Sequence, residues 1–481
     1  MKNKKPRARA ESSSNPDKNP GRLPAKGGVS RGLAFSVIIF AIAVSAAVWF
    51  GFGNSGKRGT EAYVPRPRGA VTFNKDVAPI IFNHCAGCHR PGQAAPFELL
   101  SYGDVRKHAK QIMEVTGRRY MPPWLPEPEC GEFADSRRLT AEQIGTIRQW
   151  VTEGAVEGAA SDLPPRPRWT EGWQLGEPDL VVTMPQPYTL PAEGRDVYRN
   201  FVIPIPLPDA RYVRAVEFRP GNWKVVHHAF LKLDATRDSR LRDEADPEPG
   251  FDGIHAPPNA QPPSGHFLSW QPGKVVSAGN DGLAWRLEKD TDLVLQMHLR
   301  PSGKPEQLQS SVGFYFTDRA PTNTPIKTWM NSYTIDIPAG KKDYVLEQSY
   351  TLPCDVDALG VLPHAHYLGK ELQAWAMLPD GAKQWLICIK DWDFNWQGDY
   401  RYAHPVFLPK GTVIQMRYTY DNSAGNPRNP HQPPERVQYG LQSNDEMGEL
   451  WLQLLPRDAA GLEALRRDNE SRILENSVAY N

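Results

Sequence analysis

The sequence lacks an excess of charge of either sign, because 56 Lys and Arg residues nearly balance 55 Asp and Glu residues. The balance is uneven, since residues 1–32 hold nine basic residues against Glu11 and Asp17, and the remainder is therefore net acidic. A basic surface for nucleic acid is absent outside this tail, so no nucleic-acid partner is expected.

Cysteine is scarce, with five residues in 481, and a CxxC pair occurs only once. A zinc site built from four cysteines is therefore excluded. The sequence also has no repeat at a fixed period. What it has instead is 46 prolines and 14 tryptophans, a composition that favours a loop-rich body dominated by strands.

The amino-terminal residues 1–32 have a disordered composition and precede an apolar run at 33–53 that carries no charge. This run has about the length of a membrane-spanning helix. Because the basic residues come before it, the tail is predicted to be cytoplasmic and the rest extracytoplasmic. A cleaved signal peptide is the alternative, but the run is long and lacks a small-residue cleavage site. We expect a single-pass anchor in the cell inner membrane, with the remainder on the periplasmic side.

A linker at 54–69 leads to a small helical domain at 70–158, and a second linker at 159–176 follows it. Helices are expected near 76–83, at 102–115 and at 141–153. The third has a capping box, because Thr140 is followed by Gln143 and an apolar stripe.

Beyond the second linker the apolar period changes to two, which predicts strands. Two β domains are expected at 177–320 and 321–481, with their boundary at 319–325 and a terminal helix at 458–474. The predicted strands are 213–219, 225–233, 293–299, 312–316, 344–352, 372–378, 385–389 and 412–420.

The most specific motif is Cys85-Ala-Gly-Cys88-His89. Two thiols at this spacing can add to the vinyl groups of haem while the next histidine ligates the iron, which is the pattern of c-type haem attachment. A disulfide or half of a zinc site are the alternatives. The sequence predicts one covalent haem c held by Cys85, Cys88 and His89.

Met121 is the expected second ligand of the haem iron, because it lies in a loop between the second and third helices. Met113 and His108 are alternatives, although methionine on a helix more often packs in a core. Residues 71–158 resemble a class I cytochrome c, in which Met121 matches the distal position. That resemblance implies an electron carrier.

Histidines cluster in three strand-like segments. His364 and His366 alternate, so an extended backbone places both imidazoles on one face, where they can chelate one metal. His227 and His228 are adjacent, and in a regular strand they would point to opposite faces. His298 is a single histidine in a third strand. Structural or exposed histidines are the alternative for all of these residues.

Met447 follows Asp445-Glu446, and by itself it would be read as a packing residue. Together with His364 and His366 it adds a soft thioether, which favours Cu(I) over zinc. The other histidines match no motif and are assigned surface or structural roles: His84, His108, His255, His266, His404 and His431.

These segments, in their order along the chain, resemble the copper type II, ascorbate-dependent monooxygenases, the family of peptidylglycine α-hydroxylating and dopamine β-monooxygenases. The resemblance covers about 177–455 through the contexts HHAFL, LQMHL, HAHYLGK and NDEMGEL. It implies two jelly-roll β-sandwich domains that face each other across a cleft. The expected fold class is thus a transmembrane helix, a small all-α cytochrome c domain and two all-β jelly rolls.

The resemblance also implies two coppers. His227, His228 and His298 would hold a copper that stores an electron. His364, His366 and Met447 would hold the catalytic copper that binds O2 and attacks a substrate C–H bond. We therefore expect a monooxygenase acting on a small organic substrate. Electrons would come from a membrane or periplasmic donor through the haem, with ascorbate as an alternative reductant.

Three positions depart from the family pattern. Leu362 stands where members acting on peptides carry an arginine that binds the substrate carboxylate, and Glu449 and Trp451 replace a substrate-contacting Asn and Tyr. A peptidylglycine substrate is therefore not expected. Cys354 matches a family disulfide position whose usual partner is missing, and a bridge from Cys354 to Cys388 is one option.

Two other functions compete with the monooxygenase. A copper and haem protein for electron transfer or copper sensing would share the metal sites but form no hydroxylated product. A haem-bearing β-sandwich interaction protein with structural histidines would bind no copper.

Overall fold

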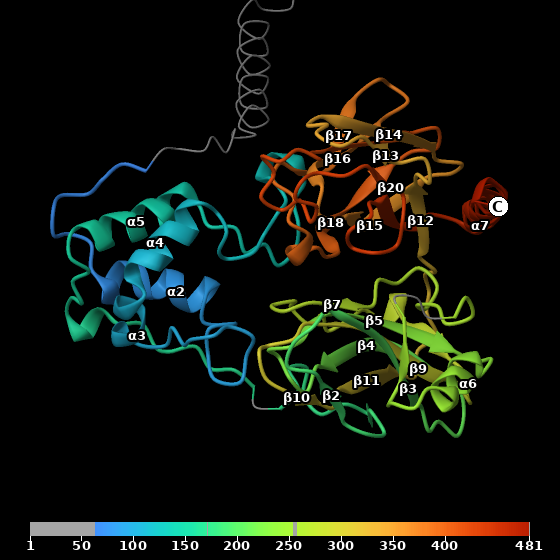
Figure 1. Ribbon diagram of the computed structural model, residues 1–481, viewed down its shortest axis with the longest axis horizontal. Coiled ribbons are helices and arrows are strands. Elements are labelled where there is room, and N and C mark those ends of the chain that lie inside the picture. Colours follow the sequence, from blue (N-terminus) through green and yellow to red (C-terminus); the bar gives the residue numbers. More distant parts are fainter. Residues whose placement is uncertain (1–62, 171, 254–256, 481) are drawn as a thin grey trace, which may run out of the picture. The chain divides into compact units, whose positions relative to one another are not determined.

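The computed structural model describes residues 63–170, 172–253 and 257–480, with side chains described up to residue 472. The predicted tail at 1–32, the apolar run at 33–53 and most of the linker at 54–69 lie outside the described residues. The described chain is predominantly β-sheet, with short helices at its amino-terminal end and one longer helix at its carboxyl end (Figure 1).

The first β assembly packs two antiparallel sheets around an apolar core that includes Phe201, Leu231, Leu295 and Phe314. One sheet has the order β1 (Leu180–Thr183), β11 (Ser311–Thr317), β4 (Arg211–Arg219) and β8 (Trp285–Leu287). The other has the order β6 (Phe251–Asp252), β3 (Val197–Pro204), β9 (Asp292–Leu299), β5 (Val226–Asp234) and β7 (Ser269–Trp270). A ribbon of β2 (Tyr188–Leu190) with β10 (Glu306–Leu308) and helix α6 (Asp238–Ala245) complete it.

The second β assembly repeats this arrangement with a core that includes Val361, Leu372, Trp392 and Tyr418. One sheet has the order β12 (Ile326–Asn331), β21 (Gly448–Pro456), β15 (Val356–Ala365) and β18 (Tyr400–Leu408). The other has the order β14 (Tyr344–Thr351), β19 (Val413–Tyr420), β16 (Gly369–Met377) and β17 (Lys383–Ile389). A ribbon of β13 (Asp336–Ile337) with β20 (Val437–Gln438) and helix α7 (Ala459–Tyr480) complete it.

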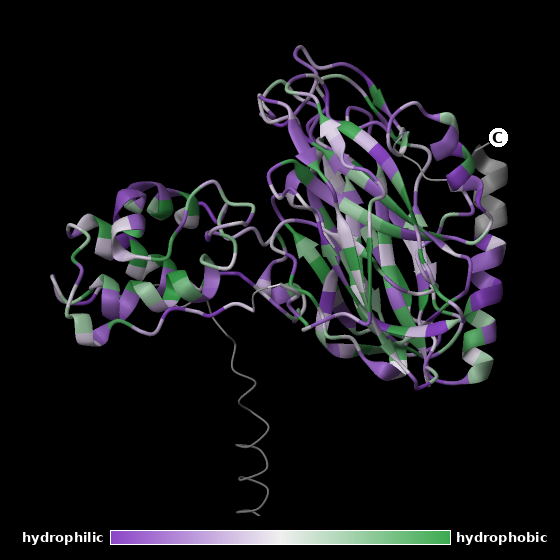
Figure 2. Ribbon diagram, turned by 90° about the horizontal axis from the view of Figure 1, so that it is seen from below, coloured by the Kyte–Doolittle hydropathy of each residue, from purple (hydrophilic) through white to green (hydrophobic). Residues whose placement is uncertain are grey.

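Alternation of apolar and polar residues along the strands explains both assemblies. Apolar and polar colours change along single strands in Figure 2. In β21, buried and half-buried residues alternate through most of the strand. Successive side chains point to opposite faces, so one face enters the core and the other looks outward. Each pair of sheets is consistent with a β-sandwich, as the two-residue period predicts.

Each of the eight predicted strands coincides with a real one, but the prediction misses the other strands, including the longer strands β3, β12, β15, β18 and β21. Gly360 and Pro363 interrupt the apolar pattern of β15. Strand β15 nevertheless pairs with β21 on one side and β18 on the other, with a bulge between Ala358 and Gly360. Tertiary pairing therefore overrides the weak local signal in this strand.

Helices form where the sequence predicts them, but one of them is broken in two and α6 was not predicted. A helical turn at Phe73–Val77 continues into α2 (Ala78–His84), and α5 (Ala141–Thr152) begins at the predicted capping box of Thr140 and Gln143. The helix expected at 102–115 is broken at His108 into α3 (Tyr102–Lys107) and α4 (Ala109–Gly117). Short helical turns also occur at Pro128–Cys130, Ala160–Asp162, Asp281–Leu283 and Phe394–Trp396.

The expected fold class is wrong in its separate all-α cytochrome domain. Residues 62–481 cluster as one compact unit, so the helical segment does not stand apart. The chain after α4 is part of the second β assembly: Phe133 lies in its core and bridges Tyr402. Backbone hydrogen bonds from Ala134 to Arg401 and from Ala403 to Glu132 continue this pairing. The helical segment has its own apolar core, but the chain after α4 contributes Phe133 to the core of the sandwich.

The expected membrane anchor is likewise not supported. Among the described residues, no helix combines the length and apolar character that crossing a bilayer requires. The apolar run at 33–53 lies outside these residues. The single-pass inner-membrane location with a periplasmic body, which was inferred from that run, is therefore withdrawn.

A disulfide joins Cys130 to Cys388, with 5.5 Å between their Cα atoms and a sequence separation of 258. This bond links the helical segment covalently to β17. Cys354 is a free, buried thiol, so the considered bridge from Cys354 to Cys388 is wrong. The structure instead pairs Cys388 with the one cysteine of the helical segment outside the CxxCH motif.

Replacing Cys130 by alanine is expected to lower the free energy of unfolding by about 2–5 kcal/mol, because the bond closes a very long loop. Cys354→Ala, which removes a buried thiol without breaking a bond, is the matched control and should cost less. Denaturant unfolding measures both, and peptide mapping without reduction should recover the 130–388 pair. Recovery of a 354–388 pair would contradict the structure.

Candidate metal centres

Three histidines converge at the end of the β5–β9 pair. His227, His228 and His298 each offer a ring nitrogen, and these nitrogens all lie within 4.8 Å of one another. The Nδ1 atom of His227 is 3.2 Å from that of His228 and 3.1 Å from that of His298. The geometry joins all three members of the predicted electron-storing site.

A bulge resolves the difficulty posed by the adjacent histidines. The register of β5 with β9 shifts between Val226 and His228, so the residue between them is extra in its strand. A bulge re-aims side chains that would alternate in a regular strand. His227 and His228 can therefore both face His298, which pairs directly with His228 across the two strands.

Asp196 fixes the orientation of His298. Its carboxylate oxygen lies 2.6 Å from Nε2 of His298, so Nε2 carries the hydrogen and Nδ1 presents a lone pair to the cluster. A carboxylate that accepts from the outer nitrogen is the usual support of a metal-ligating imidazole. The ring of Tyr198 stacks on His298 with 4.3 Å between centroids, which fixes the plane of the imidazole.

Two histidines of the cluster are held in a neutral state that suits a metal. Burial, followed by the neighbouring charge of His298, lowers the pKa of His227 to about 3. Burial lowers the pKa of His228 well below its usual range. A metal needs a deprotonated imidazole, so neither histidine has to lose a proton near neutral pH before binding. The Nδ1 atom of His298, left without a hydrogen by the bond to Asp196, lies beside Nδ1 of His227 and can bind a cation there.

The second predicted centre forms where β15 meets β21. His364 pairs with Glu449 and Ala365 with Gly448, so the antiparallel register brings the chain after Ala365 toward the residue before Gly448. Those residues are His366 and Met447, both buried. The rings of His364 and His366 lie 5.1 Å apart between centroids. The pairing thus brings the HxH motif and the methionine to one strand end.

Hydrogen bonds orient both imidazoles of this centre in the same way. Nδ1 of His364 lies 2.7 Å from the amide oxygen of Gln397, and Nδ1 of His366 lies 3.2 Å from the carbonyl oxygen of Asp445. Each Nδ1 therefore carries the hydrogen, and each Nε2 is left with a lone pair. Burial lowers the pKa of His366 to about 3, so this ring is neutral.

The carboxylate of Glu446 holds this centre together. It is fully buried and accepts hydrogen bonds from the backbone N–H groups of His366, Leu368 and Met447. One side chain therefore ties the strand end that carries His366 to the loop that carries Met447. Burial raises its pKa to about 8, while the three N–H groups favour the charged form.

The two centres face each other across the β assemblies. The charge of His364 acts on His228 from the opposite assembly. The hydroxyl of Tyr198, which stacks on His298, hydrogen-bonds to Ser443 in the loop before Met447. Arg300 adds a bond of 3.2 Å to Asn395. These contacts place the predicted centres on the half-buried faces that the two β assemblies turn toward each other, and we call the space between these faces the cleft.

The CxxCH motif occupies the turn after α2. Cys85 ends the helix, and the N–H groups of Cys88 and His89 bond back to its carbonyl oxygen at 3.1 and 3.0 Å. Both thiols are free. Nδ1 of His89 lies 3.0 Å from the carbonyl oxygen of Phe97, so Nε2 is left to ligate. This arrangement fits haem attachment, although the segment is not the separate domain that was expected.

The proposed distal ligand and its alternatives lie apart along the chain. Met121 is half-buried in the turn after α4, where its N–H bonds to the carbonyl oxygen of Val115 at 3.2 Å. His108 stacks on Phe97 with 3.9 Å between ring centroids, and Met113 packs against the helical core. His108 also acts on His89 through its charge, so the structure does not decide between these candidates, and Met121 stays the proposed ligand on its loop position alone.

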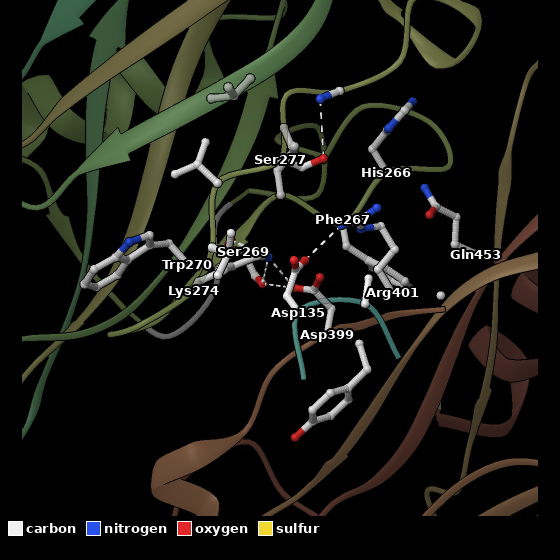
Figure 3. A pocket seen from close by; sticks show the side chains of 18 of the residues that line it. Asp135, His266, Phe267, Ser269, Trp270, Lys274, Ser277, Asp399, Arg401 and Gln453 are labelled. Carbon is white, nitrogen blue, oxygen red and sulfur yellow. Dashed lines mark hydrogen bonds and ion pairs between the residues drawn. The ribbon is translucent and has the colours of Figure 1, made fainter. Parts of the chain in front are cut away.

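A cavity of about 470 Å³ lies where the helical segment meets both β assemblies. Figure 3 shows its polar floor, in which Ser269 and Lys274 of the first assembly meet Asp399 of the second. Arg137 bonds to the carbonyl oxygen of Gly273 at 2.9 Å, and a Cβ placed on Gly273 would lie 3.1 Å from the sulfur of Cys88. The haem-attachment motif therefore reaches the first assembly at this junction.

Several supporting residues were not predicted. Asp196, Tyr198 and Gln397 lie outside every motif, and no local pattern marks them. Glu446 stands inside the quoted motif before Met447, yet only the folded chain gives it three backbone donors.

Comparisons with known proteins add no family. No family model and no curated protein matches the chain. Among solved structures, one of the infectious bursal disease virus Gx strain aligns with 58% of this chain and with 72% of the viral chain. The sequence identity is 9% and the TM-score is 0.18. A structure of PNGF-II aligns with 57% of this chain and with 65% of the PNGF-II chain, at 9% identity and with a TM-score of 0.24. Likenesses this weak carry no argument.

Asp196→Asn is expected to weaken copper binding at the three-histidine centre by roughly tenfold or more, because the charged partner of His298 is lost. Asp209→Asn, at an exposed position, is the control. Competition with a copper chelator measures the affinity of each variant. Equal affinities in Asp196→Asn and wild type would remove Asp196 from the site.

Glu446→Gln should lower the free energy of unfolding by about 1–3 kcal/mol, since an amide cannot accept from all three buried N–H groups. It should also weaken copper binding at His364, His366 and Met447 while leaving the other centre unchanged. Urea unfolding and copper titration are the measurements, with the exposed Glu435→Gln as control. A variant that unfolds and binds like wild type would show that the carboxylate is dispensable.

Proposed function

We propose that this protein is a copper-dependent monooxygenase that hydroxylates a C–H bond of a small organic substrate with O2. The observation that carries the proposal is the pair of facing centres, one with three converging imidazoles and one with an HxH motif beside a methionine. Imidazoles alone suit copper and zinc equally, but the thioether of Met447 favours Cu(I). The choice of copper therefore rests on Met447.

Bound copper would supply the one-electron redox chemistry that side chains cannot provide. The chain itself contributes geometry. Asp196 and Tyr198 hold the His298 ring, while Gln397 and the Asp445 carbonyl oxygen hold the His364 and His366 rings. Pre-set ligands bind metal without reorganisation, which is how a supporting shell contributes to a metal site.

The reaction needs an external supply of electrons. One oxygen atom enters the substrate and the other leaves as water, so each turnover consumes two electrons and two protons. We propose that one haem c on Cys85, Cys88 and His89, with Met121 as second ligand, delivers these electrons from an external donor. Ascorbate is the alternative reductant. The position of Cys88 beside Gly273 supports this, because the motif borders the assembly that holds the three-histidine centre.

A copper and haem protein for electron transfer or sensing is the competing function. The observation that favours it is Leu362, which occupies the place of the expected substrate anchor. Coupled oxygen uptake with a hydroxylated product separates the two, since only the monooxygenase transfers an oxygen atom.

Met447→Leu is expected to slow reoxidation by O2 of the fully reduced, copper-containing protein, by on the order of tenfold or more. The loss of the thioether removes a ligand while keeping side-chain volume. Rapid mixing followed by the Cu(II) resonance signal measures the rate, and Met416→Leu in the core of the same assembly is the control. Equal rates in all three proteins would rule out Met447 as part of the oxygen site.

A further inference from the structure

The two walls of the cleft carry matching rows of side chains. On β5, His228, Phe230 and Lys232 share one face, opposite the core residues Ala229 and Leu231. On the other wall, β21 presents Glu449, Trp451 and Gln453 on its half-buried face. Gln453 donates to the carbonyl oxygen of Gly265 at 2.6 Å, so this face looks toward the first assembly.

Strand register orders these rows from metal ligands to lysines. Glu449 pairs with His364, Trp451 pairs with Leu362, and Gln453 pairs with Lys327. On the opposite wall the same order runs from His228 through Phe230 to Lys232. Four residues of strand separate the ends of each wall, a span of roughly 13 Å. The cleft therefore has metal ligands at one end, an apolar middle and lysines at the other.

The apolar middle is built from aromatic rings and one aliphatic side chain. Trp451 lies 5.7 Å from Trp329 between ring centroids, and Leu362 is its direct partner on β15. Phe230 contacts His228 at 5.4 Å. An elongated apolar group would lie against these surfaces on its way to His364.

The two lysines come together at the far end. The ammonium group of Lys327 lies over the Trp451 ring at 5.7 Å. Leu231 and Leu233, the neighbours of Lys232, bond to Leu268 and Gln261, and Gly265 of that same segment accepts from Gln453, the strand partner of Lys327. In agreement with this, burial, followed by the charge of Lys232, lowers the pKa of Lys327 to about 8. A Cβ on Gly265 would lie 1.9 Å from the Pro325 carbonyl oxygen, which shows how closely the walls meet here.

Neither cation is neutralised by the described chain. No ion pair to Lys232 or Lys327 forms among the residues that the structure describes, and the other charge acting on Lys327 is positive. His266 is also near, because burial and then Lys327 lower its pKa to about 4. Two close, partly desolvated ammonium groups without a counter-charge favour an anion between them.

We propose that Lys232 and Lys327 form the anion-binding end of the substrate cleft, and that the substrate is an elongated apolar molecule with a terminal carboxylate. The carboxylate sits between the two lysines, and the hydrocarbon body crosses Trp451 and Leu362 to reach His364. This inference rests on the proposed function only in calling the ligand a substrate. The anion site itself depends on the two lysines alone.

Glu449 and Leu362 set the direction of the ligand. Glu449 shares its row with His364, and its carboxylate accepts from the Trp451 ring nitrogen at 3.1 Å. A negative charge beside the metal ligands repels a substrate carboxylate from that end. Leu362, the place of the expected arginine, offers only apolar contact. We therefore expect the substrate carboxylate to bind at Lys327 and Lys232, farther from the metal ligands than Leu362.

The test measures binding of decanoate to the full chain by calorimetry, without reductant and without turnover. Decanoate is expected to bind at least about tenfold more tightly than decanol, because charge-assisted contacts add to the apolar ones. Lys232→Met and Lys327→Met, which keep an apolar stem, should each lose about tenfold in decanoate affinity and leave decanol unchanged. The exposed Lys342→Met is the matched control.

Charge reversal guards against variants that merely fold poorly. Lys327→Glu should bind decyltrimethylammonium in preference to decanoate, a gain that a misfolded protein cannot show. Equal binding of decanoate and decanol, or undiminished decanoate binding in both methionine variants, would overturn the anion site. Binding to vesicles of anionic phospholipid without binding of decanoate would also overturn it, since the source would then be a membrane headgroup.

The outcomes for the subsite and for the proposed function are separate. Lysine-dependent decanoate binding with no oxygen incorporation, even with copper and reductant present, would leave the anion site standing and refute the monooxygenase. Hydroxylation of a neutral compound at a rate that neither methionine variant changes would support the monooxygenase and refute the role of the lysines in binding the substrate.

Discussion

The pairing of β15 with β21 is the constraint on which the second proposed metal centre depends. About eighty residues separate His366 from Met447, and only the antiparallel register brings them to one strand end. Glu446 holds His366 and Met447 together, because its carboxylate accepts hydrogen bonds from the backbone N–H groups of both residues. A buried carboxylate is costly unless it is fully hydrogen-bonded, so the three donors both permit Glu446 and fix the loop.

The three-histidine centre likewise depends on features that lie outside its histidine motifs. A bulge in β5 turns two adjacent histidines to one side, and Asp196 sets the tautomer of the third. Burial keeps His227 and His228 neutral in one centre and His366 neutral in the other, and hydrogen-bond partners orient His298, His364 and His366. They differ in which nitrogen points inward: Nδ1 at the three-histidine centre and Nε2 at His364 and His366. The two centres are thus built alike but oriented differently.

The helical segment belongs with the second β assembly in the folded chain. Its connection includes a disulfide, a strand-like bridge and Phe133 in the sandwich core. Together these explain why a separate all-α domain was the wrong expectation: the segment keeps its own small core, but it is joined to the second assembly by pairing and by a disulfide with residues much later in sequence. The same junction brings Cys88 beside the first assembly, so the haem-attachment motif, the cleft and both centres belong to one compact unit.

The sequence alone determined the ligand types and the local elements. The spacing of CxxCH and HxH, the capping box at Thr140 and the two-residue period of the strands are local properties, and each is readable from neighbouring residues. Tertiary structure decided what depends on distant pairing. The bulge at His227, the partner of Cys388, the roles of Asp196 and Glu446, and the meeting of Lys232 with Lys327 all join residues far apart in the chain. No local pattern encodes them, because strand register and side-chain packing arise only when the sheets assemble.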